Sequence, residues 1–193
     1  MRLFPTAAAS LLIAPVLMAV TPPVPRPAPE FVIQFPGGDQ KLLSSYRGKV
    51  VCIEFLYTTC PHCQHASQVF GKLFNEYGSQ GFQPIGVAFN DMPNMLVPDF
   101  IKNQNLIHPV GFADREKVLD FLGISMMERF VVPQIVWIDK KGNIRSQTSP
   151  MAEQKLLEES TWREMIETLL KEPGPTVKKT ATQHTTARAK KGN

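Results

Sequence analysis

The sequence predicts an α/β fold built on a mixed β-sheet, and two patterns in the chain support this prediction. An apolar run at 50–57 is followed by a helical pattern and then by a second apolar run at 82–90. Two strands joined by a helix form a right-handed parallel βαβ unit. The segments 134–139 and 143–147 predict an antiparallel hairpin around a tight turn. The chain has 193 residues, of which 43% are hydrophobic, enough for one domain with a sizeable core.

The N-terminal 20 residues resemble a secretory signal peptide. Arg2 precedes an Ala- and Leu-rich stretch, and cleavage is expected after Ala19. An uncleaved membrane anchor is the alternative, although the apolar run is short for a membrane span. Both alternatives predict an exported protein, periplasmic or otherwise extracytoplasmic, and the second adds a membrane tether. The alternating prolines of 21–29 predict an extended linker that packs against nothing.

The folded domain is expected at 30–171, with its elements set by hydrophobic periodicity. In chain order the sequence predicts, besides the segments above, a strand at 31–35, a short extended piece at 41–43, a helix at 95–105, a short extended piece at 108–112, a helix at 115–122 and a closing helix at 153–170. The segment Glu172-Pro-Gly-Pro175 ends that helix, and 172–193 is predicted to be a disordered basic tail.

The net charge of +4 belongs to this tail. From Lys171 onward the chain has six basic residues and one acidic residue, whereas the remainder has fifteen basic and sixteen acidic residues. The folded body is therefore close to neutral, and we expect no nucleic-acid partner, which would require a basic face.

The tetrad Cys60-Pro61-His62-Cys63 lies between the first apolar strand and its helix. The helix is indicated by apolar residues at offsets of three and four, namely Ala66, Val69, Phe70, Leu73, Phe74 and Tyr77. Pro61 suits the first turn, where its missing N–H costs nothing. The helix N-terminus should stabilise a thiolate, so we expect a lowered pKa and an exposed, attacking thiol at Cys60. Cys63 lies one turn further and should resolve the mixed disulfide, while His62 lowers the thiol pKa further.

The residues around these cysteines exclude one other role and leave two open. Haem attachment requires a histidine directly after the second cysteine, but Gln64 stands there. A zinc site would have to recruit Cys52, His62 or His65, and an inert structural disulfide is a further alternative. Cys52 lies on the buried strand and is expected to be a small packed hydrophobe, and His65 a solvated helix residue.

The tetrad and its flanking strand and helix resemble the active site of the thioredoxin superfamily. Cys-Pro-His-Cys is similar to the tetrad of the bacterial oxidant DsbA, and the chain from about 30 to 171 is similar to the TlpA/ResA-type oxidoreductases of the redoxin branch. The resemblance implies a three-layer α/β/α fold with a redoxin-type insertion at 91–112. It also implies a thiol-disulfide oxidoreductase that acts on protein thiols and disulfides together with an upstream redox partner. Because the dithiol itself carries the electrons, no metal or organic cofactor is expected.

Three residues outside the tetrad complete the predicted site. Glu54 lies on the buried strand, so burial should raise the pKa of its carboxyl group. The resemblance implies that Glu54 lies beneath the second cysteine and accepts the Cys63 proton. It also implies that Pro133 follows a cis peptide bond and faces the cysteine pair, and that the backbone of Val132 binds the substrate as an added strand.

The sequence leaves open two rival functions and the direction of electron flow. A peroxidase of the AhpC/TSA type would have Thr or Ser three residues before its reactive cysteine and Pro seven before, but Tyr57 and Ile53 stand there. A Sco-like copper-binding chaperone would have three residues between its cysteines and a distal histidine, for which His108 is the candidate. The Pro-His dipeptide favours an oxidant or isomerase, whereas the redoxin-like body is similar to reductases.

Overall fold

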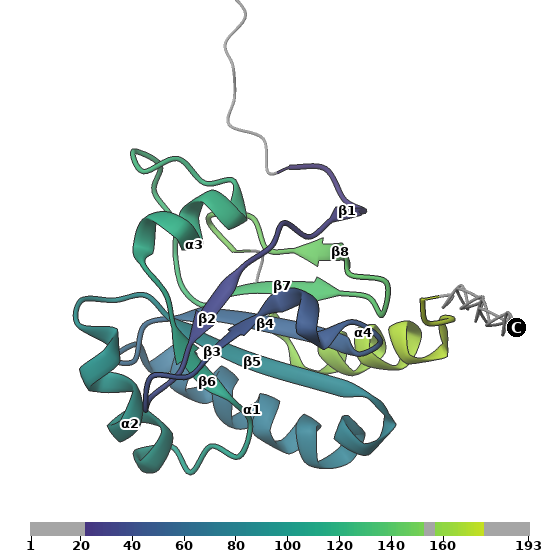
Figure 1. Cartoon of the computed structure of the whole chain (residues 1–193), viewed down its shortest axis with the longest axis horizontal. Helices are drawn as coiled ribbons and strands as arrows, with labels where there is room; N and C mark the ends of the chain where they lie inside the picture. The colour runs from purple at the N-terminus through teal and green to yellow at the C-terminus, as the bar shows by residue number, and fades with distance from the viewer. Residues whose placement is uncertain (1–21, 153–156, 176–193) are drawn as a thin grey trace, which may run out of the picture.

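The computed structural model describes residues 22–152 and 157–175, and these form one mixed β-sheet with helices on both faces (Figure 1). The strand order is β1-β8-β7-β4-β5-β6-β2-β3. The bounds of the strands are β1 Arg26–Pro27, β2 Val32–Gln34, β3 Gln40–Leu42, β4 Val50–Leu56, β5 Phe82–Ala88, β6 Val110–Phe112, β7 Gln134–Ile138 and β8 Asn143–Gln147. The predicted α/β fold with a mixed sheet is confirmed.

Strand β4 is the centre of the sheet, and all seven of its residues are buried. It pairs with β5 in parallel and with β7 in antiparallel register. Its apolar, β-branched sequence is what a strand covered on both faces requires. Successive side chains of β4 point to opposite faces of the sheet, so its odd-numbered and even-numbered residues pack against different helices.

Three layers result from this arrangement (Figure 1). Helices α1 (Pro61–Tyr77), α2 (Pro93–Asn103) and α4 (Glu159–Lys171) cover one face of the sheet, and α3 (Arg115–Leu122) covers the other. The core beneath α1 and α4 is rich in aromatic rings, with Phe70 stacked on Trp162 at 4.3 Å. The core beneath α3 contains Phe31, Phe55 and Phe121 in mutual contact.

Most predicted elements are present within two residues of their expected bounds, but the closing helix is shorter than predicted. Helix α4 begins at Glu159 rather than at residue 153. Residues 153–156 lie outside the described part of the chain, and Leu157 precedes the helix. The main aromatic anchor of α4 is Trp162, which is 2% exposed and was not part of the predicted apolar stripe.

The prediction that 21–29 packs against nothing was wrong. Arg26 and Pro27 form strand β1, which pairs with β8 at one edge of the sheet. The Arg26 guanidinium donates a hydrogen bond to the Gln147 side chain at 2.7 Å, and Ala28 packs against the core. Backbone pairing requires no particular side chain, so a proline-rich sequence can still supply a short edge strand.

The segment expected as an insertion, 91–112, contains α2 and β6, and β6 extends the sheet next to β5. None of the helices in the described stretches is long and apolar enough to cross a membrane. The signal or anchor predicted at 1–20 lies outside the described residues, as does the tail beyond Pro175. The disorder predicted from residue 172 was wrong for Glu172, whose carboxylate pairs with Arg145 at 2.5 Å and whose carbonyl accepts a hydrogen bond from Lys140 at 3.0 Å.

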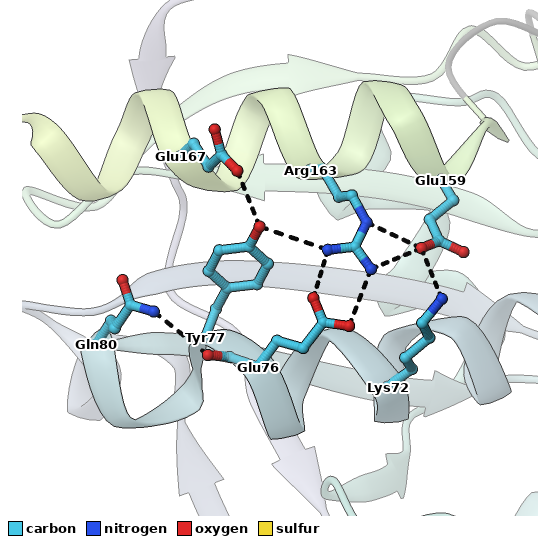
Figure 2. A network of polar contacts seen from close by, with 7 residues as sticks. All are labelled: Lys72, Glu76, Tyr77, Gln80, Glu159, Arg163 and Glu167. Carbon is cyan, nitrogen blue, oxygen red and sulfur yellow. Dashed lines mark hydrogen bonds and ion pairs between the residues drawn. The ribbon is translucent and has the colours of Figure 1, made fainter.

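Helices α1 and α4 are also joined by a surface network of charged side chains (Figure 2). Arg163 of α4 forms ion pairs with Glu76 of α1 and with Glu159 one turn earlier, while Lys72 pairs with Glu159 at 3.1 Å. Tyr77 donates a hydrogen bond to Glu167 at 2.9 Å. The network lies on the C-terminal half of α1, away from the cysteines. It adds ion pairs between the helix that carries the cysteines and its neighbour α4.

Candidate active site

Cys60 is the N-cap residue of α1, at the junction between β4 and the helix. Its backbone is extended, with φ −83° and ψ 120°, and its carbonyl accepts the first helical bond from the Gln64 N–H at 3.0 Å. Pro61 occupies the first turn, as predicted. The side chain of Cys60 is half-buried, so its sulfur lies at the surface beside the unpaired N–H groups of the first helical turn.

The loop that precedes Cys60 is held by hydrogen bonds rather than by packing alone. The Cys60 N–H donates to the Tyr57 carbonyl at 3.0 Å. The side chain of Asn90 accepts from the Thr58 N–H, and the side chain of Gln64 donates to the Thr58 carbonyl, each at 3.0 Å. Asn90 and Gln64 therefore fix the turn that presents the first thiol, a role that the sequence did not indicate.

Cys63 differs sharply from Cys60 in its surroundings. Its side chain is fully buried against Leu56, Ala88 and Val97. Burial raises the pKa of the Cys63 thiol, and the nearby Glu54 carboxylate and the Cys60 thiol raise it further. The helix thus presents one accessible thiol and one protonated, buried thiol next to it, as predicted for an attacking and a resolving cysteine.

Glu54 is buried on β4 at 1% exposure, on the same face of the strand as Cys52 and Leu56. One carboxyl oxygen, Oε2, accepts a hydrogen bond from the Ser67 hydroxyl at 2.6 Å. The other oxygen, Oε1, is buried and has no hydrogen-bond partner among the residues that the structure describes. Burial raises the pKa of Glu54 to about 8, and the Ser67 hydrogen bond opposes that rise. The raised pKa predicted from the strand position is confirmed.

Ser67 was not predicted as a site residue, although the sequence contains a signal for it. It lies four residues after Cys63, hence on the same helix face, and it interrupts the apolar stripe at a fully buried position. A hydroxyl buried at such a place needs a partner, and Glu54 is the partner that the fold supplies.

Val132 and Pro133 lie beside the first thiol, as the resemblance implied. The Val132–Pro133 peptide bond is cis. The Cys60 thiol is 3.8 Å from the Val132 carbonyl oxygen, within the range of a weak S–H···O hydrogen bond. Pro133 is buried directly before β7, whereas Val132 is half-buried.

His62 is exposed and lines a hollow of about 500 Å³ together with Val132, Pro133 and Met151. The structure thus places Val132 against the Cys60 sulfur and Glu54 near Cys63, while His62 and Pro133 line one hollow together with Val132. Pro61 lies in the first turn of the helix. His65 is exposed on the helix, as predicted.

The two remaining candidates from the sequence lie in the interior. Cys52 is buried in the core beneath α1 and α4, as expected for a packed hydrophobe. His108 is 4% exposed and packs near Gly71 of α1, and neither ring nitrogen has a hydrogen-bond partner in the described part of the chain. Among the described residues, no three His, Cys, Asp or Glu side chains form a group suited to a metal ion.

A comparison with protein families supplies an independent observation. Residues 23–166 match the model of the Redoxin family. The chain belongs to the Redoxin family. The matched region includes β1, which agrees with the finding that this strand is part of the folded domain rather than of a linker.

This redoxin is similar to several described thiol-disulfide proteins. It is 28% identical to the thiol-disulfide oxidoreductase ResA of Geobacillus thermodenitrificans over 61% of this chain and 64% of that protein. It is 30% identical to the ResA of Halalkalibacterium halodurans over 68% and 72% of the two chains. The match thus spans less than two thirds of the first of these relatives.

The fold of this redoxin also matches solved structures. A thiol:disulfide interchange protein of the thioredoxin family from Chlorobium tepidum superposes with a TM-score of 0.62 and 25% identity, over 77% of this chain and 99% of that one. The thioredoxin-like α/β fold that the sequence predicted is therefore confirmed.

Proposed function

We propose that this redoxin is a thiol-disulfide oxidoreductase that exchanges disulfides with protein cysteines through Cys60 and Cys63. The observation that carries the proposal is the asymmetry of the two thiols. Cys60 lies at the surface at the start of α1, and Cys63 is fully buried next to the carboxyl group of Glu54. The similarity to ResA proteins supports the same activity.

The exchange takes two steps in the reducing direction. The Cys60 thiolate attacks one sulfur of the substrate disulfide, forms a Cys60–substrate disulfide and releases the other substrate sulfur as a thiolate. Cys63 then attacks the Cys60 sulfur, forms the Cys60–Cys63 disulfide and releases the second substrate thiolate. The enzyme dithiol loses two electrons and two protons, and the substrate disulfide gains them. The oxidising direction is the reverse of these steps.

The second step requires that Cys63 lose a proton in a site that disfavours the thiolate. Glu54 is suited to accept this proton because its Oε1 oxygen has no partner within 22–152 and 157–175 and is buried on the Cys63 side of the sheet. A carboxyl group with a pKa of about 8 is a far stronger base than an exposed one, so the transfer to it is less unfavourable. The rate of this step should therefore rise with pH through about 8.

Val132 and His62 complete the proposed machinery. The Val132 backbone lies beside the attacking sulfur and can pair with an extended substrate segment as an added strand. His62, exposed two residues after Cys60, can donate a hydrogen bond to the thiolate and so stabilise it. The dithiol carries the electrons, so the proposed cycle uses no metal or organic cofactor.

The cellular setting belongs to the same proposal. The apolar N-terminal stretch supports export to an extracytoplasmic space, with or without a retained membrane tether. A second redox protein must restore the dithiol or the disulfide after each cycle. The Pro61-His62 dipeptide supports an oxidising role and the ResA similarity a reducing one.

Cysteine variants test the proposed chemistry directly. With Cys63→Ser, the mixed disulfide between Cys60 and a substrate protein should accumulate and be visible on a non-reducing gel. With Cys60→Ser it should not form, and Cys52→Ser should behave as the native protein. Equal trapping by the Cys60 and Cys63 variants would refute the assigned roles. Equilibration with glutathione then gives the potential of the pair, and a value well above that of glutathione indicates an oxidant.

A further inference from the structure

Three adjoining hollows are lined by close neighbours of Cys60, namely Val132, Thr59 and His62. The first, of about 560 Å³, is lined by Arg115, Arg129, Phe130 and Val132 among others, and is called here the Arg115 hollow. It shares Val132 with the His62 hollow, and it shares Tyr57 and Arg115 with a third hollow of about 450 Å³. The Cys60 sulfur is 3.8 Å from the carbonyl oxygen of Val132, which lines two of these hollows, so a polypeptide bonded to Cys60 would lie next to them.

The Arg115 side chain is held in place at the junction of two hollows. Its guanidinium donates a hydrogen bond to the Tyr57 hydroxyl and lies 5.0 Å from the centre of the Phe130 ring. Phe130 stacks on Phe89, and Tyr57 contacts Phe89 edge to face. A guanidinium fixed by an aromatic cage loses less side-chain entropy when it binds an anion than a free one does.

This guanidinium has no acidic partner within the described residues, where Arg115 and Arg129 form no ion pair. By contrast, the neighbouring Lys117 of α3 pairs with Asp114 at 2.7 Å, and Arg163 on α4 has two carboxylates. Glu128 also lines the hollow and offsets one of the two positive charges. The lining therefore keeps a net positive charge, centred on a cation that is oriented but unpaired.

We propose that the Arg115 hollow receives an acidic side chain of the protein substrate, located within a few residues of the cysteine that bonds to Cys60. The proposal rests on the function proposed above and narrows its substrate class to polypeptides with Asp or Glu close to the reactive cysteine. Arg115 would bind the carboxylate with its fork of N–H donors, and Arg129 would add long-range attraction. Both residues then determine specificity without touching the reacting sulfurs.

Pairs of short peptides test the proposal. Each peptide carries one cysteine in a disulfide with 2-mercaptoethanol, has blocked ends, and differs from its partner only by Glu or Gln at one position. The position is moved along either side of the cysteine. Reduced protein is mixed with each peptide, the reaction is stopped with acid, and mass spectrometry gives the second-order rate constant. We expect the Glu peptide to react about three- to fivefold faster at one or two positions, and less so at high ionic strength.

Variants of α3 supply the control. Arg115→Gln should abolish the preference for Glu, and Arg115→Glu should favour a Lys peptide at the same position. Lys117→Gln removes the same charge from the same helix outside the hollow, and it should retain the native preference. A preference for Glu that persists in a folded Arg115→Gln protein would overturn the proposal. So would equal native rates for the Glu and Gln peptides at every position, a result that needs no variant.

Exchange of the native protein with 2-hydroxyethyl disulfide separates this inference from the function on which it rests. That disulfide is small and uncharged, so its reaction depends on the cysteine pair and not on the hollow. Failure to react with it and with every peptide refutes the oxidoreductase proposal itself. Reaction with it, together with equal rates for all Glu and Gln peptides, refutes only the assignment of the Arg115 hollow.

Discussion

Replacing Glu54 by Gln should make the reduced protein more stable, and the gain should grow with pH. The side chain is 1% exposed, and its Oε1 oxygen has no hydrogen-bond partner in the described part of the chain. Burial raises the pKa of the carboxyl group from 4.5 to about 8. Gln keeps the shape and can still accept the Ser67 hydrogen bond, but it cannot become charged.

The magnitude follows from the two pKa values. A carboxyl group whose pKa is raised by folding binds its proton more tightly in the folded state, so its contribution is complete below pH 4.5 and is lost as pH rises through about 8. Over that window the free energy of unfolding of the native protein should fall by about 5 kcal/mol, with about 3 kcal/mol lost by pH 7. The Gln variant lacks this loss, so the difference between the two proteins is near zero at pH 4.5.

Urea unfolding of the reduced proteins at a series of pH values measures this difference. Glu116, exposed on α3, provides a matched Glu→Gln control whose effect should not vary over the same range. The resolving step is measured in parallel from the decay of a preformed Cys60 mixed disulfide, and in the Gln variant it should be slow and lose its rise with pH. A stability difference that is constant between pH 4.5 and 8 would show that the carboxyl group ionises as an exposed one does.

Three further predictions concern parts of the fold away from the sulfurs. Burial lowers the pKa of His108 to about 4, so acid should cost the native protein about 3 kcal/mol as pH falls from 6.5 to 4, and a His108→Leu protein should lack that loss in acid unfolding curves. Arg163→Met should lower the melting temperature slightly and only at low salt, whereas Trp162→Ala, which empties the core beneath α4, should cost about 3–5 kcal/mol at any salt concentration. Gly111→Ala should destabilise the β2–β6 pair by about 1–3 kcal/mol, because its methyl group would lie 2.3 Å from a β2 carbonyl oxygen. Gly71→Ala is the control: outside its own helix the nearest side-chain atoms are 3.8 Å away, so it should be neutral or stabilising in the same denaturant titration.

The parts of the fold that the sequence predicted are those with a strong periodicity. Strand β4 is apolar throughout, and α1 repeats its apolar residues every three or four positions, so both were found close to their bounds. Strand β1 was missed because two residues have no period, and its pairing with β8 is made by backbone groups that every sequence carries. The start of α4 was misplaced because the predicted apolar stripe includes Leu157, which lies before the first residue of the α-helix.

The residues of the site also fall into those that a local sequence pattern indicates and those that it does not. Cys60, Cys63 and Glu54 could be predicted because their chemistry depends on a local spacing and on the parity of one strand. Arg115 could not, because it is brought to Tyr57 across 58 positions of the chain by the packing of α3 on the sheet. Partners of this kind are a property of the tertiary fold, and no pattern within one segment indicates them.

Buried Glu54 and buried His108 change stability with pH in opposite directions. The His108 contribution is lost as pH falls from 6.5 to about 4, and the Glu54 contribution is lost as pH rises from 4.5 to about 8, so the two together should leave stability highest between pH 4.5 and 6.5. For His108 an apolar residue would serve the core equally well. For Glu54 the loss of stability is complete at about pH 8, where the carboxylate that can accept the Cys63 proton appears in the folded protein. The burial that costs the fold stability is what gives this carboxylate its basicity, and a stabilised Gln variant that resolves slowly would connect the two effects in one side chain.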